Sequence, residues 1–248
     1  MTKLVAQLFL ILIFTSLLSF DGLAQNKTQN SSYKTFKIDN FRCFVSDGVM
    51  RQEANGTWNT KPLAILSKAL KKVNEVYPDK ALDLFHRTFL YIEWNKPGAL
   101  GLYVKGDKGP SSISNHINCI ELNGMKFVTE NNNNKKLESN NAATLVLLHE
   151  FAHCYHHQIL GWENGSIKNA YQNAKNKTIF DLKSYLMSSD KEYFAELTTA
   201  FLDKHYSIPK SKQEIKQKDV MGFALMESIW GNNDDKKGAG KNIKNIVP

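Results

Sequence analysis

Cysteine and arginine are both scarce in this chain of 248 residues, and each scarcity excludes a class of protein. The three cysteines, Cys43, Cys119 and Cys154, are an odd number, and no two of them are close in sequence. These features exclude a disulfide-dense small domain and a cysteine-based zinc finger. A single bridge between Cys43 and Cys119 remains open.

The only arginines are Arg42, Arg51 and Arg87, although the net charge is +8. Lysines therefore carry the charge, and they are spread along the chain among 24 acidic residues. Nucleic-acid binders usually cluster their basic residues and use arginine for bidentate contacts. The pattern predicts a solvated basic surface and no nucleic-acid partner.

A long apolar run is found only at the start of the chain. Residues 4–20 are mostly apolar behind Lys3, and small residues precede Gln25. This order is typical of a secretory signal peptide over residues 1–24. An uncleaved membrane anchor is the alternative, for which the apolar run is short. The mature protein is expected to be secreted or periplasmic, without stable membrane insertion, and monomeric.

The rest of the chain is long enough for one well-buried domain. We expect a catalytic domain over residues 35–231, preceded by a flexible leader at 25–34 and followed by a flexible tail at 232–248. Alternation and β-branched composition predict strands at residues 36–45, 88–94, 99–104 and 117–122. Helical spacing of apolar residues predicts helices at residues 61–77, 78–85, 142–160, 189–205 and 219–230. Strands before a mainly helical second half indicate an α+β fold.

Residues 149–153 read His-Glu-Phe-Ala-His, the H-E-x-x-H pattern, inside a predicted helix. Residues four apart lie on one helix face, so His149 and His153 can reach one ion, while Glu150 is placed to act as a general base. Chance gives the pattern roughly 0.01 times in a chain of this composition. A solvent-facing helix turn is the alternative, and the pattern favours a metal site.

Catalytic zinc normally has three protein ligands, so a third must be found. The extended pattern with a third histidine needs histidine where this chain has Ile159, which excludes that class. His157 lies about 12 Å along the helix axis from His149, too far to bind the same ion. His156 is closer to the site face and is interpreted as a cleft-lining or surface residue.

Two glutamates in the following helix, Glu192 and Glu196, are the remaining candidates. Of two glutamates four residues apart, one can bind the metal while the other hydrogen-bonds a ligand histidine. Glu192 has a competing interpretation, because Ser189 and Glu192 also form a capping box that would satisfy the helix start. The residues alone leave the choice between the two glutamates open.

The segments His-Glu-Phe-Ala-His-Cys-Tyr-His-His-Gln-Ile-Leu-Gly (149–161) and Glu-Tyr-Phe-Ala-Glu-Leu-Thr-Thr-Ala-Phe (192–201) resemble known enzymes. They are similar to the glutamate-type zincins (gluzincins) of the anthrax lethal factor catalytic domain group, and to secreted lethal-factor-like zinc metallopeptidases. The resemblance runs from about Phe41 to Trp230. After Phe201 the chain departs from it, with a lysine-rich stretch in place of the usual aromatic residues.

The resemblance implies a zincin-like fold, with a small mixed sheet, an active-site helix carrying the motif and a second ligand helix. It implies that Glu192 is the third zinc ligand and that Glu196 is the hydrogen-bond partner of a ligand histidine. It also implies that Tyr185 stabilises the oxyanion that develops during peptide hydrolysis. Residues 117–122 would form the edge strand beside the active-site helix. An extended peptide substrate would lie along that edge.

The expected function is zinc-dependent endopeptidase activity on protein or peptide substrates, with Glu150 as the base. The rival is a secreted binding or structural domain that is stabilised by zinc and does not cleave peptides. A purely structural site usually takes four protein ligands and has no use for a base at position 150, which favours catalysis.

Overall fold

A computed structural model describes residues 33–56, 61–95, 100–106, 118–124, 126, 142–205 and 207–231. The predicted signal peptide, most of the predicted leader and the predicted tail lie outside the described residues. Strand β1 begins at Tyr33, two residues before the expected start of the domain. Within the described residues, no helix is both long enough and apolar enough to cross a membrane.

The described strands form one five-stranded mixed sheet in the order β1-β2-β3-β5-β4. Strands β2, β3 and β5 are parallel to one another, while β1 and β4 run antiparallel to their neighbours. With the helices described below, this sheet confirms the predicted α+β class. The strands are β1 (Tyr33–Ile38), β2 (Phe41–Ser46), β3 (Phe89–Glu93), β4 (Gly101–Val104) and β5 (Cys119–Asn123).

The single strand predicted at residues 36–45 is wrong, because the chain turns back on itself at Asp39 and Asn40. Both residues have positive φ angles, 48° and 76°. A two-residue turn with both φ angles positive connects paired strands well and favours asparagine and aspartate. The segment is therefore the hairpin of β1 and β2.

The prediction of residues 117–122 as the edge strand is also wrong, because β5 lies inside the sheet between β3 and β4. Its polar residues are buried as well, since Glu121 and Asn123 are 7% and 1% exposed. The edge strand beside α6 is β4, in which Leu102 is 53% exposed. The strands predicted at 88–94 and 99–104 are present, but they do not pair with each other.

The helices predicted at 61–77, 78–85, 142–160, 189–205 and 219–230 are all present. They are α3 (Pro62–Val76), α4 (Asp79–Phe85), α6 (Ala142–Tyr155) with its π-helical extension η3 (His156–Leu160), α8 (Asp190–Leu202) and α10 (Val220–Trp230). Gly161, with a φ angle of 79°, ends the motif helix. Sequence analysis missed α2 (Asp47–Asn55), α7 (Gly165–Asn176) and α9 (Lys212–Lys218).

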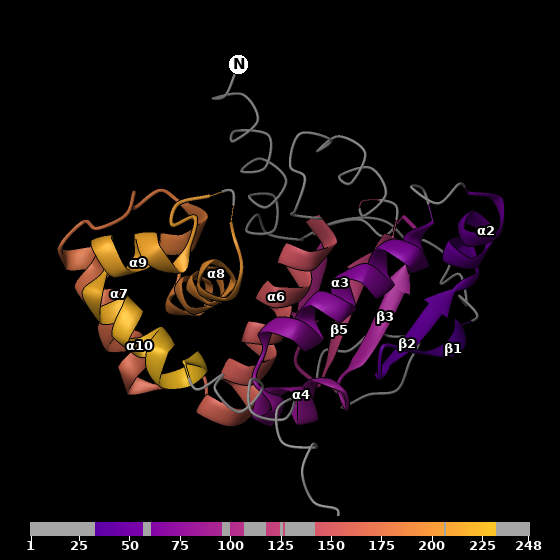
Figure 1. Cartoon of the computed structure of the whole chain (residues 1–248), viewed down its shortest axis with the longest axis horizontal. Helices are drawn as coiled ribbons and strands as arrows, with labels where there is room; N and C mark the ends of the chain where they lie inside the picture. Colours follow the sequence, from indigo (N-terminus) through magenta and orange to yellow (C-terminus); the bar gives the residue numbers. More distant parts are fainter. Residues whose placement is uncertain are drawn as a thin grey trace, which may run out of the picture.

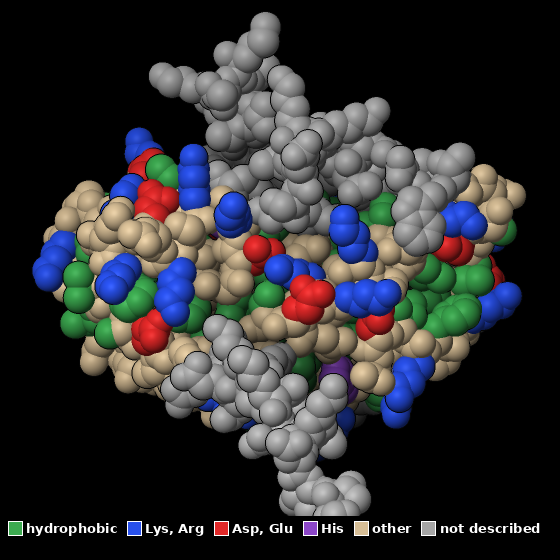
Figure 2. Space-filling view, viewed as in Figure 1, with side chains coloured by type: hydrophobic (Ala, Val, Ile, Leu, Met, Phe, Trp, Pro, Cys, Tyr) green, Lys and Arg blue, Asp and Glu red, His purple; other side chains and the backbone are tan. Residues whose placement is uncertain are grey.

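Helices α3 and α6 pack against each other over the sheet, and helices α7 to α10 gather on the side of α6 away from β1 and β2 (Figure 1). Helix α8 makes the most extensive contact with α6. The motif helix is therefore held between the sheet and the second group of helices. Figure 2 shows Lys and Arg side chains scattered among Asp and Glu over the visible face.

An aromatic core orients the motif helix. Phe151, the third residue of the motif, is fully buried and packs 4.5 Å from the Phe85 ring and 5.4 Å from the Phe41 ring. The Tyr77 hydroxyl, at the end of α3, donates a hydrogen bond to the Leu148 carbonyl oxygen at 2.6 Å. Because these residues anchor one side of α6 in the core, the histidines of the motif are turned toward α8.

Candidate metal centre

The two histidines of α6 meet side by side. His149 Nε2 and His153 Nε2 are 3.0 Å apart, and the rings lie 4.6 Å apart at 84°. This is the consequence of their spacing, because residues four apart lie one turn above each other on the same face. Both side chains are buried.

Helix α8 contributes Glu192 to the same point. Its Oε2 lies 3.0 Å from His149 Nε2 and 3.3 Å from His153 Nε2. The capping box is only half realised, because Ser189 Oγ accepts a hydrogen bond from the Glu192 backbone N–H at 3.1 Å while the carboxylate faces the histidines. Ser189 therefore starts the helix, and Glu192 is available for the site.

These three residues could hold a metal ion. Their three facing atoms lie within 3.3 Å of one another. Donor atoms around a tetrahedral ion bound at about 2.05 Å are about 3.3 Å apart, so the spacing suits zinc. Glu192 Oε2 is buried, and no hydrogen-bond donor among the described residues is aligned on it. An orphaned buried oxygen beside two imidazole nitrogens is what a cation site requires.

The charges of these residues also favour a bound cation. Burial raises the pKa of Glu192, but the facing imidazoles of His149 and His153 outweigh it and hold that pKa well below its usual range. Burial lowers the pKa of His149, whereas Glu192 and Glu196 raise it by more. The two carboxylates create a negative potential that stabilises a proton on His149 and would equally stabilise a divalent cation.

Glu196 fixes the orientation of one imidazole. Its Oε1 lies 2.9 Å from His149 Nδ1. Nδ1 thus donates its proton to Glu196, and the Nε2 lone pair faces Glu192 and His153. The structure places Glu192 against both imidazoles and Glu196 behind one of them.

Glu150 lies between the histidines and the edge strand. It is 7% exposed, and its Oε2 accepts a hydrogen bond from the Tyr103 backbone N–H at 2.6 Å. Burial raises the pKa of Glu150, and the nearby His149 and His153 oppose that shift. A carboxylate with a raised pKa is well suited to take up and release a proton near neutral pH.

Tyr185 also lies at the centre. It begins the short 3₁₀ helix η4 (Tyr185–Met187), and its ring stacks on His149 with centroids 5.9 Å apart at 27°. Burial and then the negative charge of Glu192 raise the pKa of the Tyr185 hydroxyl far above its usual value. The hydroxyl therefore keeps its proton and can donate it in a hydrogen bond.

The interpretation of His156 as a cleft-lining or surface residue is wrong. Its side chain is fully buried, and its ring lies 4.8 Å from Trp162 and 5.0 Å from Phe194. Helix α8 covers this turn of the motif helix, and no local sequence pattern indicates that contact. Burial, and then the charge of His153, lower the pKa of His156 to about 4.

His157, which the sequence excluded as a ligand, is engaged elsewhere: its Nδ1 is 2.8 Å from the Tyr103 hydroxyl. The open bridge between Cys43 and Cys119 is not formed: all three cysteines are free and buried. Strand β3 separates the strands that carry Cys43 and Cys119.

One centre residue was missed by sequence analysis. His205, 9% exposed, follows α8, and its Nε2 lies 3.5 Å from Glu196 Oε2. It belongs to no motif and comes after Phe201, where the resemblance fades. Neither spacing nor similarity could have selected it.

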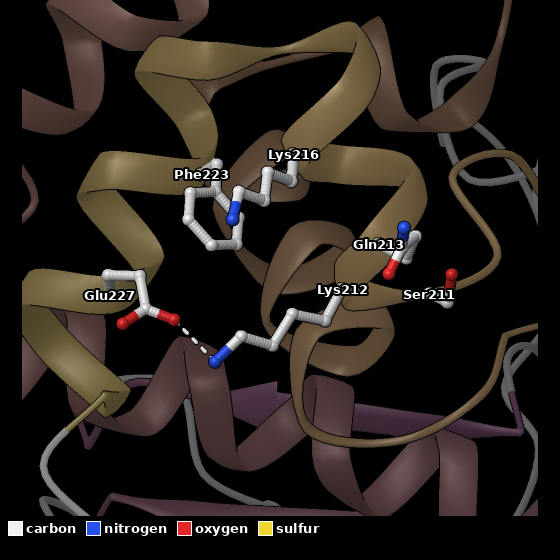
Figure 3. Close-up of a pocket in the computed structure, with 6 residues that line it drawn as sticks. All are labelled: Ser211, Lys212, Gln213, Lys216, Phe223 and Glu227. Atoms are coloured by element: carbon white, nitrogen blue, oxygen red, sulfur yellow. Dashed lines mark ion pairs between the residues drawn. The ribbon is translucent and has the colours of Figure 1, made fainter.

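A separate hollow of about 590 Å³ lies at helices α9 and α10 (Figure 3). Its lysine Lys212 already forms an ion pair with Glu227. None of the histidines or glutamates of the centre lines this hollow, whose lining residues are Ser211, Lys212, Gln213, Lys216, Phe223 and Glu227.

Comparison with known proteins gives no match: no family model, no characterised protein and no solved structure corresponds to the chain. The functional conclusion therefore depends on the geometry of the centre and on the resemblance of its two motifs.

Proposed function

We propose that the protein is a zinc-dependent endopeptidase with a zincin-like fold, similar to the secreted lethal-factor-like metallopeptidases. The observation that carries the proposal is the convergence of His149 Nε2, His153 Nε2 and Glu192 Oε2 within 3.3 Å, beside the buried carboxylate of Glu150. These three residues would hold the zinc ion. When bound, zinc supplies the Lewis acidity that activates water and polarises a peptide carbonyl.

Glu150 performs the proton transfers. Its carboxylate accepts a proton from the attacking water and passes it to the leaving amine, which a raised pKa favours. Tyr185 keeps its hydroxyl proton and donates a hydrogen bond to the developing oxyanion. The stacking of Tyr185 on His149 supports this role, because it places the phenol ring at the centre.

The peptide substrate lies along β4, which takes the place of the edge strand expected at 117–122. The Tyr103 N–H is directed to Glu150 and not to β5, so this side of β4 faces the centre. An extended peptide binds a free strand edge by main-chain hydrogen bonds. The proposal includes export after removal of residues 1–24.

The rival, a zinc-stabilised domain without activity, would have a fourth protein ligand and no buried base. Within the part of the chain that the structure describes, the group that could hold a metal ion has three members. Three ligands leave a position for water and substrate, which supports catalysis.

The test is cleavage of a peptide library by the purified protein and by Glu150→Gln, with zinc content measured for both. The proposal predicts cleavage that a chelator abolishes, and loss of cleavage in the variant while zinc is retained. Equal cleavage by the variant would remove Glu150 as the base. Zinc binding without cleavage of any peptide would favour the rival.

A further inference from the structure

His205 and Glu196 form a contact outside the three residues that could hold the ion. Glu196 is 13% exposed in its side chain and His205 is 7% exposed, so the two groups meet with little water around them. Glu196 uses Oε1 for His149 Nδ1 at 2.9 Å and Oε2 for His205 Nε2 at 3.5 Å. One carboxylate thus bridges two imidazoles.

The backbone sets the ring orientation of His205. The Ser207 N–H donates a hydrogen bond to His205 Nδ1 at 3.0 Å, which is shorter than the 3.4 Å between Nδ1 and the Ser207 carbonyl oxygen. A nitrogen that accepts a hydrogen bond carries no proton, so the neutral ring has its proton on Nε2. The nitrogen that carries this proton is the one that lies 3.5 Å from Glu196 Oε2.

The segment that carries His205 is itself tied down. The His205 backbone N–H donates to the Lys210 carbonyl oxygen at 2.8 Å, which closes the loop after α8. The histidine is therefore held by two backbone contacts that are independent of the centre. A group held in this way can restrain Glu196, which a freely rotating side chain could not do.

From these contacts we infer that His205 is a positioning residue of the metal centre. Its Nε2–H holds the carboxylate of Glu196, and Glu196 in turn fixes the proton of His149 on Nδ1 and directs Nε2 to the ion. The inference rests on the proposed function, because it requires that His149, His153 and Glu192 bind zinc. It assigns His205 no contact with the ion or the substrate.

Removing a partner of this kind weakens the ion's binding without removing a ligand. Loss of a group that directly supports a ligand typically costs about 10–100-fold in metal affinity. His205 acts one step further away, so we expect a loss of about 3–10-fold on its removal.

Two substitutions separate positioning from general packing. Glutamine can place its amide nitrogen near the position of Nε2, whereas the shorter asparagine mimics Nδ1 and cannot reach Glu196. The inference predicts that His205→Gln keeps most of the zinc affinity and that His205→Asn loses it. His86→Gln is the matched control, because His86 hydrogen-bonds Asn74 through Nε2 and lies outside the centre.

The experiment measures zinc affinity of the full chain by competition with a chromogenic chelator, in both the native and the Glu196→Gln background. We expect His205→Asn to lose zinc affinity, and we expect His205→Gln and His86→Gln to keep it. In the Glu196→Gln background, His205→Asn should cause no further loss of zinc affinity. Equal affinities of the two His205 variants, additive losses, or an equal loss in His86→Gln would overturn the inference. If the native chain binds no zinc, the proposed function fails together with the inference. If the native chain binds zinc but the His205 variants behave differently from this expectation, only the inference fails.

Discussion

The Tyr103 backbone N–H donates a hydrogen bond to Glu150 Oε2 across 2.6 Å. This contact joins the edge strand β4 to the motif helix α6 at the residue proposed as the general base. In the proposed mechanism this contact would couple substrate binding to proton transfer, because a peptide along β4 would lie beside the carboxylate. The geometry of β4 should consequently affect catalysis more than metal binding.

Gly101→Ala tests the approach of β4 to α6. An added Cβ would lie 2.3 Å from Val146 Cγ1 and 3.1 Å from Glu150 Cγ, so the strand or these two side chains must shift. We expect a loss of about 1–3 kcal/mol in the free energy of unfolding, typical of an overpacked site. Peptide cleavage should fall further than stability alone explains, while zinc content is unchanged.

Gly165→Ala is the control for that substitution, because a Cβ there meets no atom within 4 Å. It should lose neither stability nor activity. Denaturant unfolding and peptide cleavage of the two variants would be compared. If Gly101→Ala cleaved peptides at the rate of the native protein, cleavage would not require β4 to lie closely against α6.

Glu192→Gln and Glu196→Gln distinguish a ligand from its support. Glu192 faces both motif imidazoles, whereas Glu196 contacts only one of them, His149, at the nitrogen that points away from Glu192. We expect Glu196→Gln to weaken zinc binding by about 10–100-fold and Glu192→Gln to weaken it by more. Equilibrium dialysis with zinc would measure both, and the reverse order would exchange the two assignments.

Tyr185→Phe removes one hydroxyl beside His149. If that hydroxyl donates to the oxyanion, kcat should fall by about 10²–10³-fold with little change in KM or zinc content. Tyr91→Phe, on β3, is the control, since Tyr91 packs against Phe44 with ring centroids 4.8 Å apart, away from the centre. An equal kcat for Tyr185→Phe and the native protein would exclude the role.

His156 should make stability depend on pH. Burial, and then the charge of His153, lower its pKa in the folded protein to about 4, below the ordinary 6.5. Between these values the unfolded chain binds a proton that the folded protein excludes, so stability falls as pH falls from 6.5 to about 4 and levels off below. We expect the effect on the free energy of unfolding to be on the order of 2 kcal/mol.

His156→Phe should lose that part of the pH dependence, because the ring packs against Trp162 and Phe194 and has no hydrogen-bond partner among the described residues. Denaturant unfolding of both proteins between pH 4 and 8, in chelator so that metal release plays no part, would measure the difference. Parallel pH curves for the two proteins would refute a lowered pKa at His156.

Local patterns predicted the elements that depend on nearby residues. Helical spacing identified α3, α4, α6, α8 and α10, and the four-residue interval between His149 and His153 predicted their contact. The choice of Glu192 over Glu196 needed the resemblance, because spacing alone treats both glutamates alike. The structure then separates them by contact, with one facing both imidazoles and the other facing one.

Long-range packing explains what could not be predicted. The pairing of β5 between β3 and β4 depends on segments that are distant in sequence, and its buried Glu121 resembles an exposed strand residue. His156 is covered by a helix that comes more than thirty residues later. His205 reaches Glu196 only because the loop after α8 folds back, which no periodicity encodes.

The most direct test of the account is the zinc content of the folded protein after dialysis, compared with that of a folded His153→Ala variant. The account predicts about one zinc ion per chain in the native protein, since a site of three protein ligands holds a single ion, and none in the variant. A native protein that is folded by circular dichroism and never takes up zinc would contradict it, as would undiminished zinc binding by the variant.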